Sequence, residues 1–135
     1  MQRWRLKNEY GVTQISVSDV EKTAEEMKRQ GYRLVVMTCT PAVGGGFDIT
    51  YSFDKELSLK HFRITMPAES DIPSICKSYS GAFVYENEIH DLYGFVFHGM
   101  TIDFKGTFIR TSVPYPFKKE IPAPTVTKVK KEDAA

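Results

Sequence analysis

The sequence lacks the features that mark several specialised classes of protein. No apolar run approaches the roughly 20 residues that a membrane-spanning helix needs, and the first ten residues are too polar for a secretory signal. Eighteen basic residues stand against seventeen acidic ones, and this net charge of +1 provides no field for attracting DNA or RNA. We therefore expect a chain that binds no nucleic acid and reaches a membrane only through other proteins.

Cysteine is scarce as well. The two thiols, Cys39 and Cys76, are far apart and outside any CxxC pattern, whereas iron–sulfur clusters generally take four ligands. The three histidines do not have the spacing of a structural zinc site. The triple glycine at 44–46 lacks the Gly-Lys-Ser/Thr ending of a phosphate-binding loop. We expect two free thiols in a reducing cytoplasm and no cofactor bound by this chain.

Hydrophobic residues at 41% and charged residues at 26% of 135 positions fit one ordinary globular core. A surface helix is predicted over 18–30, because Ser18 and Glu21 form a capping-box pattern and Gly31 can supply a left-handed stop. Its buried stripe recurs at helical spacing: Val20, Ala24 and Met27. A short strand is predicted ahead of it, within 12–17.

The hydrophobic period then changes to that of strands. Residues 32–40 are β-branched and aliphatic, 47–53 alternate as in a half-buried antiparallel strand, and 57–66 alternate again. A helix followed by a three-stranded meander predicts an α+β fold of two layers, with the N-terminal helix packed on a mainly antiparallel sheet.

Proline and glycine mark the elements of the second half. A short helical piece is predicted over 73–79, because proline suits the first position of a helix. A second helix is predicted over 82–93, ending at Gly94, with short extended segments at 95–97 and 102–104.

The end of the chain differs in composition from the rest. It carries four prolines and a lysine-rich terminus, and it has too few apolar residues for a second core. We expect a single domain over 1–112 and an extended tail over 113–135, an arm that becomes ordered only against a neighbouring surface.

The predicted second helix carries polar groups on both sides. Glu86 and His90 fall one turn apart inside the apolar arc, and the opposite side bears Asn87, Glu88 and Asp91. A carboxylate in an apolar face costs several kcal/mol unless it is paired or hydrogen-bonded. Either Glu86 and His90 satisfy each other, or Glu86 reaches a basic group or backbone donor on a partner. Such a helix suits a position between its own sheet and another subunit.

A metal site or an acid–base pair built on Glu86, His90 and Asp91 is a further alternative. No second helix carries a matching pair of ligands, and no nucleophile or glycine elbow accompanies the group. A stand-alone metal-binding enzyme domain therefore remains the weaker interpretation.

The run Ile-Pro-Ser-Ile at 72–75, six further residues, Ala82, and Glu-Asn-Glu-Ile-His-Asp-Leu-Tyr-Gly-Phe at 86–95 resemble one signature. That signature reads Pro-Ser, a spacer, Ala, Glu-Arg-Glu, two residues, Asp, a hydrophobic residue, an aromatic residue and Gly. It resembles the thirty-kilodalton subunit of respiratory complex I and its relatives in energy-converting membrane-bound nickel–iron hydrogenases. The resemblance covers roughly residues 15–99.

Two departures from the family pattern stand out. Asn87 occupies the position of the arginine between the two glutamates, and His-Gly-Met-Thr-Ile-Asp-Phe-Lys-Gly at 98–106 replaces the Gly-His-Pro-Asp-Leu-Arg-Arg of the complex I subunits. Together with the short length, the second departure favours the hydrogenase branch.

The resemblance implies a non-catalytic peripheral subunit at the cytoplasmic face of the cell membrane, with no active site or cofactor of its own. The nickel–iron centre and the iron–sulfur clusters would belong to a hydrogenase-like large subunit and a cluster-bearing small subunit, which this chain holds together. The complex would couple ferredoxin-linked hydrogen evolution to ion translocation. The alternatives are the equivalent subunit of a respiratory NADH or coenzyme:quinone dehydrogenase, and an adaptor domain with other partners.

The residues expected at the partner interface are those of the motif. Their expected partners are arginines or backbone donors on the large subunit. They are Pro73, Ser74, Glu86, Glu88, His90, Asp91, Tyr93 and Gly94.

Overall fold

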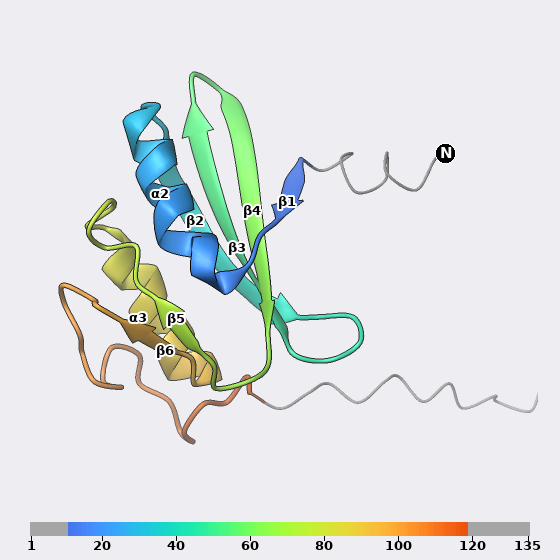
Figure 1. Ribbon diagram of the computed structural model, residues 1–135. Coiled ribbons are helices and arrows are strands. Elements are labelled where there is room, and N and C mark those ends of the chain that lie inside the picture. Colours follow the sequence, from blue (N-terminus) through green and yellow to red (C-terminus); the bar gives the residue numbers. More distant parts are fainter. Residues whose placement is uncertain (1–10, 119–135) are drawn as a thin grey trace, which may run out of the picture.

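The computed structural model describes residues 11–118 (Figure 1). Its elements in chain order are β1 (Val12–Gln14), the 3-10 turn η1 (Val17–Asp19), α2 (Val20–Arg29), β2 (Arg33–Pro41), β3 (Phe47–Lys55), β4 (Ser58–Met66), β5 (Asp71–Pro73), α3 (Ala82–Tyr93) and β6 (Val96–His98). Four strands form one sheet in the order β1–β4–β3–β2. The meander β2–β3–β4 is antiparallel, and β1 adds to β4 in parallel. A separate parallel pair joins β5 and β6.

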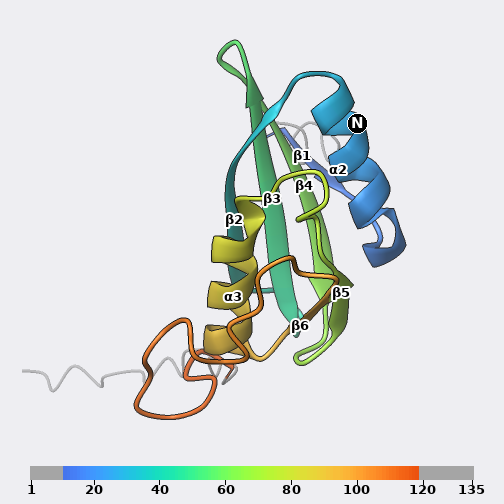
Figure 2. The ribbon, with the colours of Figure 1, turned by 90° about the vertical axis from the view of Figure 1, so that its left-hand side faces the viewer.

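Both helices lie over the same face of the sheet (Figures 1 and 2). On β3 this face carries four buried side chains: Phe47, Ile49, Tyr51 and Phe53. Helix α2 packs onto it with the predicted stripe of Val20, Ala24 and Met27, all buried in the same core cluster. The predicted α+β fold, a helix packed on a mainly antiparallel sheet and followed by a second helix, is confirmed.

The opposite side of β3 is also buried, so the expectation of a half-buried strand over 47–53 was wrong. The small polar side chains there are Thr50, Ser52 and Asp54. Longer side chains of the flanking strands reach over them: Arg63 donates to Thr50 at 3.1 Å, His61 pairs with Ser52 at 2.7 Å, and Arg33 donates to Asp54 at 2.6 Å. Burial of a central strand thus comes from its neighbours across the sheet, which alternation along one strand does not reveal.

The start of the first helix differs from the prediction. Helix α2 begins at Val20, after the 3-10 turn, and the capping box does not form. The Ser18 hydroxyl instead lies 2.9 Å from that of Ser16, whose hydroxyl also donates to Asp19. The predicted stop is confirmed, since Gly31 has a φ of 87°.

The short helix predicted over 73–79 was also wrong. Pro73 ends strand β5, and the next amide, Ser74 N–H, donates to the His98 carbonyl at 2.8 Å. Residues 75–79 form a turn closed by a Tyr79 N–H bond to the Ile75 carbonyl. The extended segment predicted at 102–104 is not assigned to a strand, whereas the second helix spans Ala82–Tyr93 and stops at Gly94 as predicted.

Tyrosine hydroxyls hold α3 and the turn before it against the edge strand β2. Tyr79 donates to the Tyr32 carbonyl at 2.7 Å, Tyr85 to that of Val35 at 2.9 Å, and Tyr93 to that of Cys39 at 2.8 Å. Because these carbonyls lie in or just before an edge strand, the bonds also occupy acceptors that another strand could have paired with.

The segment after β6 returns along α3. The Phe117 N–H donates to the Leu92 carbonyl at 2.9 Å, and the Tyr115 ring packs over Gly94. Residues 113–118 of the expected tail are therefore in contact with the domain, while 119–135 lie outside the described residues. The boundary after residue 112 and the extended arm stay predictions.

Replacing Gly94 by Ala tests how this end of α3 is built. Gly94 has a φ of 87°, and an added Cβ would lie 3.3 Å from the Tyr115 ring. We expect Gly94→Ala to lower the free energy of unfolding by about 1–2 kcal/mol in urea titrations, since a left-handed conformation strains any residue with a Cβ. Gly81→Ala is the matched control, because Gly81 has a φ of −67° and open space around it. Equal effects of the two variants would contradict this account.

Candidate functional site on helix α3

The carboxylate of Glu86 lies in the interior between α3 and the turn that follows β5. Glu86 is 0% exposed. Its Oε2 accepts hydrogen bonds from Ser74 Oγ at 2.6 Å and Cys76 Sγ at 3.2 Å, and its Oε1 accepts one from Ile75 N–H at 2.8 Å. Ser74 Oγ in turn accepts the Cys76 N–H at 3.1 Å. One carboxylate therefore binds the side chains of Ser74 and Cys76 and the backbone amide of Ile75 between them.

The electrostatics of this cluster follow from burial. Burial raises the pKa of Glu86, and the bonds from Ser74, Ile75 and Cys76 oppose that rise because they stabilise the charged form. Burial also raises the pKa of the Cys76 thiol, which therefore stays protonated at neutral pH and can donate. The pKa of Tyr51 is raised by burial first and by the nearby Glu86 charge second. Cys76 and Cys39 are both free and buried.

The opposite side of α3 holds a second irregular segment. Asn87 is 0% exposed; its Nδ2 donates to the Ile102 carbonyl at 2.9 Å, and its Oδ1 accepts the Phe104 N–H at 3.0 Å. One turn later, Asp91 is 4% exposed and its Oδ2 accepts the Ile109 N–H at 2.7 Å. Sequence reasoning placed both residues on the polar side and missed that the chain covers them with its own backbone.

The two departures from the family pattern contact each other. Asn87 stands where the family pattern has arginine, and both of its partners in the loop lie in the divergent run 98–106. A guanidinium has no acceptor and could not receive the Phe104 N–H. The contacts of position 87 with Ile102 and Phe104 together therefore require a side chain that both donates and accepts, as an amide does.

The other motif residues have separate partners. His90 Nδ1 lies 2.7 Å from the Phe95 carbonyl, so the internal Glu86–His90 pair proposed from helical spacing does not form. Tyr93 bonds the Cys39 carbonyl, Glu88 is partly exposed, and Pro73 lies in β5. The contacts of the motif with another chain stay predictions.

The metal or acid–base alternative required Glu86, His90 and Asp91 to converge. They instead bind three different segments: the 74–76 turn, the Phe95 carbonyl and the Ile109 amide. Between residues 11 and 118, no group of three or more His, Cys, Asp or Glu side chains could hold a metal ion. Glu86, His90 and Asp91 therefore do not come together as the metal ligands or the acid–base pair of that alternative.

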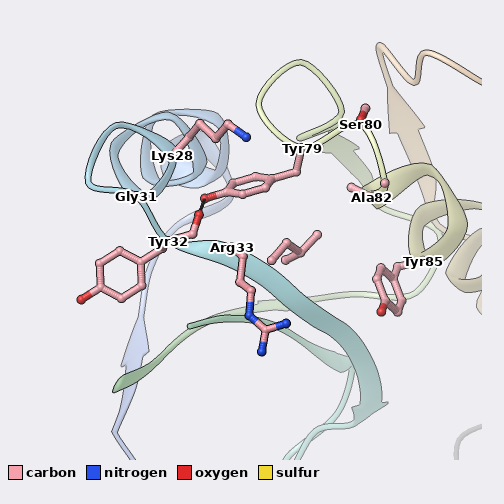
Figure 3. A pocket seen from close by; sticks show the side chains of 10 residues that line it. Lys28, Gly31, Tyr32, Arg33, Tyr79, Ser80, Ala82 and Tyr85 are labelled. Carbon is pink, nitrogen blue, oxygen red and sulfur yellow. Dashed lines mark hydrogen bonds between the residues drawn. The ribbon is translucent and has the colours of Figure 1, made fainter. Parts of the chain in front are cut away.

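A pocket of about 600 Å³ lies between the end of α2, the start of β2 and residues 79–85 (Figure 3). Its lining contains no histidine, carboxylate or cysteine. The Lys28 ammonium lies 5.2 Å from the centre of the Tyr79 ring, and Arg33 is paired with Asp54. The hydroxyls of Tyr79 and Tyr85 are bonded to backbone carbonyls. The pocket thus offers no nucleophile with an adjacent base.

A model of a known protein family matches most of this chain. The family model described as "Respiratory-chain NADH dehydrogenase, 30 Kd subunit" matches residues 13–127. An NADH-quinone oxidoreductase subunit from Bartonella bacilliformis is 34% identical over 61 residues, and the subunit of the same name from Xanthobacter autotrophicus is 41% identical over 64 residues. Each alignment covers 44% of this chain and 30% or 29% of the relative, respectively. The matched segment thus spans less than a third of each curated relative.

The fold also has a counterpart among solved structures. A chain in the structure of the membrane-bound sulfane sulfur reductase, an archaeal respiratory membrane complex, superposes with a TM-score of 0.67 at 17% identity. The superposition covers 78% of this chain and 65% of that one. At this identity the likeness shows a shared fold. Within 11–118, neither helix has the length and apolar character needed to cross a bilayer.

Replacing Glu86 by Gln tests the role of the buried carboxylate in the fold. The amide keeps the shape but turns an NH₂ group toward donors, so a buried donor loses its acceptor. We expect Glu86→Gln to lower the free energy of unfolding by about 2–4 kcal/mol in chemical denaturation. Glu88→Gln, on the same helix but partly exposed, should change it by less than about 0.5 kcal/mol. Two similar small losses would rule out a structural role for Glu86.

The raised pKa of Glu86 gives the stability a predictable dependence on pH. Because its folded-state pKa lies above the ordinary 4.5, the folded chain holds this proton over a pH range where the unfolded chain releases it. The free energy of unfolding of the wild type, relative to Glu86→Gln, should therefore increase as the pH falls through the folded-state pKa toward 4.5. Urea titrations of both proteins across this range measure the difference. A difference that shrinks on acidification would mean that the pKa is lowered.

Proposed function

This chain belongs to the family of the 30 kDa subunit of respiratory-chain NADH dehydrogenase, and we propose that it is a non-catalytic, peripheral subunit of a complex I-like respiratory membrane complex. The observation that carries the proposal is the arrangement of the family motif on α3. Glu86, Asn87 and Asp91, its buried polar side chains, bind this chain's own backbone and side chains. These groups stabilise a rigid surface and are not arranged around a substrate.

A structural role for such a surface has a physical basis. Electron transfer and proton delivery depend on cofactors held at fixed distances, and a rigid neighbouring protein maintains those distances. We place the nickel–iron centre and the iron–sulfur clusters of the proposed complex in its large and small subunits. This chain would contact both and would reach the cytoplasmic face of the membrane through them.

Within the family, we propose the branch of energy-converting hydrogenases, in which ferredoxin-linked hydrogen evolution is coupled to ion translocation. The support is the contact between Asn87 and Phe104, two positions at which this sequence departs from the complex I pattern. The departures form one connected structural change around α3. We expect a change of this kind where the surface of the partner subunit differs from that in complex I.

The second candidate is the corresponding subunit of an NADH or coenzyme:quinone dehydrogenase. The names of the two curated relatives, both subunits of NADH-quinone oxidoreductase, favour it. It shares the structural role and differs in the identity of the partner subunits.

Isolation of the complex separates these possibilities. The affinity-tagged chain, expressed in its own organism and recovered from gently solubilised membranes, should bring down a large subunit and a cluster-bearing subunit in constant ratio, identified by mass spectrometry. Hydrogen evolution from reduced ferredoxin by the recovered complex would support the hydrogenase branch, and quinone reduction would support the alternative. Recovery of the chain alone, with turnover of a substrate by the isolated protein, would refute the subunit role.

A further inference from the structure

The hairpin that joins β3 to β4 ends in a tight turn of two residues, Glu56 and Leu57. The strands are paired up to Lys55 and Ser58, the residues on either side of this turn. Both turn residues have a positive φ, 50° for Glu56 and 68° for Leu57. Turns with two left-handed residues strongly prefer pairs such as Asn-Gly, because most side chains with a Cβ are strained in that conformation. The turn therefore carries strain that a glycine at position 57 would remove.

The side chain of Leu57 is almost completely exposed. It is 96% exposed, and Leu59, two residues further along the chain, is 57% exposed. The hairpin reaches past the end of α2 in both views of the ribbon (Figures 1 and 2). A single exposed leucine is ordinary on a protein surface. A leucine that is both exposed and held in a left-handed conformation contributes nothing to the stability of residues 11–118, so another role has to account for it.

The base of the hairpin is fixed to the rest of the domain. Lys55 Nζ donates to the Gln30 carbonyl at 2.7 Å and lies 5.9 Å from the centre of the Tyr32 ring. Lys60 Nζ, on the other strand, lies 5.1 Å from the centre of the same ring. The turn is thus held out on an anchored base, and a contact made by Leu57 would lose little conformational entropy on binding.

The charges around the turn indicate the kind of surface that it fits. Lys55 and Lys60 flank the two leucines in the sequence, and the exposed Glu56 precedes Leu57 directly. None of the ion pairs formed within 11–118 includes Glu56. An anionic membrane surface would attract the lysines but repel a carboxylate at the very tip. Protein interfaces combine an apolar centre with a polar rim, which accommodates both signs of charge. The mixed charge therefore favours a protein surface over a bilayer.

We propose that Leu57 inserts into an apolar pocket on the surface of a neighbouring subunit, with Leu59 at the edge of the contact. The inference rests on the proposed function, since it requires a partner chain, and it adds a contact away from the motif helix. Burial of the leucine side chain in the complex offsets the strain of the turn, which the free chain carries without compensation. Strained backbone of this kind is often found at positions that bind a partner or a ligand.

Replacing Leu57 by Gly separates the stability of the free chain from its binding. Glycine adopts the left-handed conformation without strain, so Leu57→Gly should raise the midpoint of thermal unfolding of the full-length chain by about 3 °C. Leu57→Met, which keeps both the apolar side chain and the strain, should leave the midpoint unchanged. A lower midpoint for Leu57→Gly would mean that Leu57 packs against its own chain, and it would overturn the proposal.

Recovery of the complex from gently solubilised membranes tests the contact itself. Tagged Leu57→Gly should recover about tenfold less of a partner subunit than the wild type, because full burial of a leucine side chain corresponds to at least about that factor in an equilibrium constant. Leu57→Met should recover the wild-type amount. Val43→Ser is the matched control, since Val43 is equally exposed on the loop at the other end of β3, and it should also recover the wild-type amount.

The same experiment distinguishes this inference from the proposed function. Equal recovery by Leu57→Gly and the wild type would overturn the Leu57 contact and leave the subunit role standing. Failure of the wild type to recover any partner would overturn the subunit role, and with it the contact that depends on it.

A photoreactive residue in place of Leu57 identifies what covers the turn. In the recovered complex, p-benzoylphenylalanine at this position should crosslink to one partner subunit, with the site located by mass spectrometry. The same residue in place of Val43 should not crosslink to that site. A crosslink from position 57 to a lipid, to a second copy of this chain, or to residues 1–10 or 119–135 of the same chain would overturn the proposal.

Discussion

The buried carboxylate of Glu86 joins helix α3 to the turn that follows β5, and the arrangement of β5, α3 and β6 depends on this contact. The turn after β5 has no helical or sheet hydrogen bonds for the amide of Ile75, and Glu86 supplies the missing acceptor. The same carboxylate binds the side chains of Ser74 and Cys76. With this turn fixed to α3, strand β5 is aligned to pair with β6, the strand that follows the helix. One carboxylate, through three hydrogen bonds, thus holds the turn after β5 against α3 in the unit formed by β5, α3 and β6.

The other side of helix α3 also supplies polar side chains that bind irregular backbone. The chain after β6 runs without regular secondary structure through residue 118, so its backbone needs side-chain partners wherever it is buried. Asn87 and Asp91 lie one helical turn apart, and they accept hydrogen bonds from the amides of Phe104 and Ile109, two successive points along that segment. A helix suits this purpose because its rigid backbone presents polar groups at fixed spacing on two faces.

This architecture explains why the conspicuous acidic motif is compatible with a structural subunit. Charged groups at an active site face a ligand, whereas Glu86 faces the turn of its own chain and Asp91 is bonded to its own loop. The other oxygen of Asp91, Oδ1, is buried and has no hydrogen-bond donor among residues 11–118. The fold is therefore stabilised by contacts within the chain, and its exposed surface is available for interactions with other subunits.

The sequence by itself determined what depends on neighbouring residues. The stripe of α2, the strands of the meander and the span of α3 up to Gly94 follow from periodicity and from one glycine, and the family follows from the spacing of its motif. Only the tertiary structure decided that Glu86 binds Ser74 across 12 positions and that Asn87 binds Phe104 across 17. It also decided that Pro73 ends a strand rather than beginning a helix. These outcomes depend on which segments meet in space, and a local pattern of side chains contains no information on that meeting.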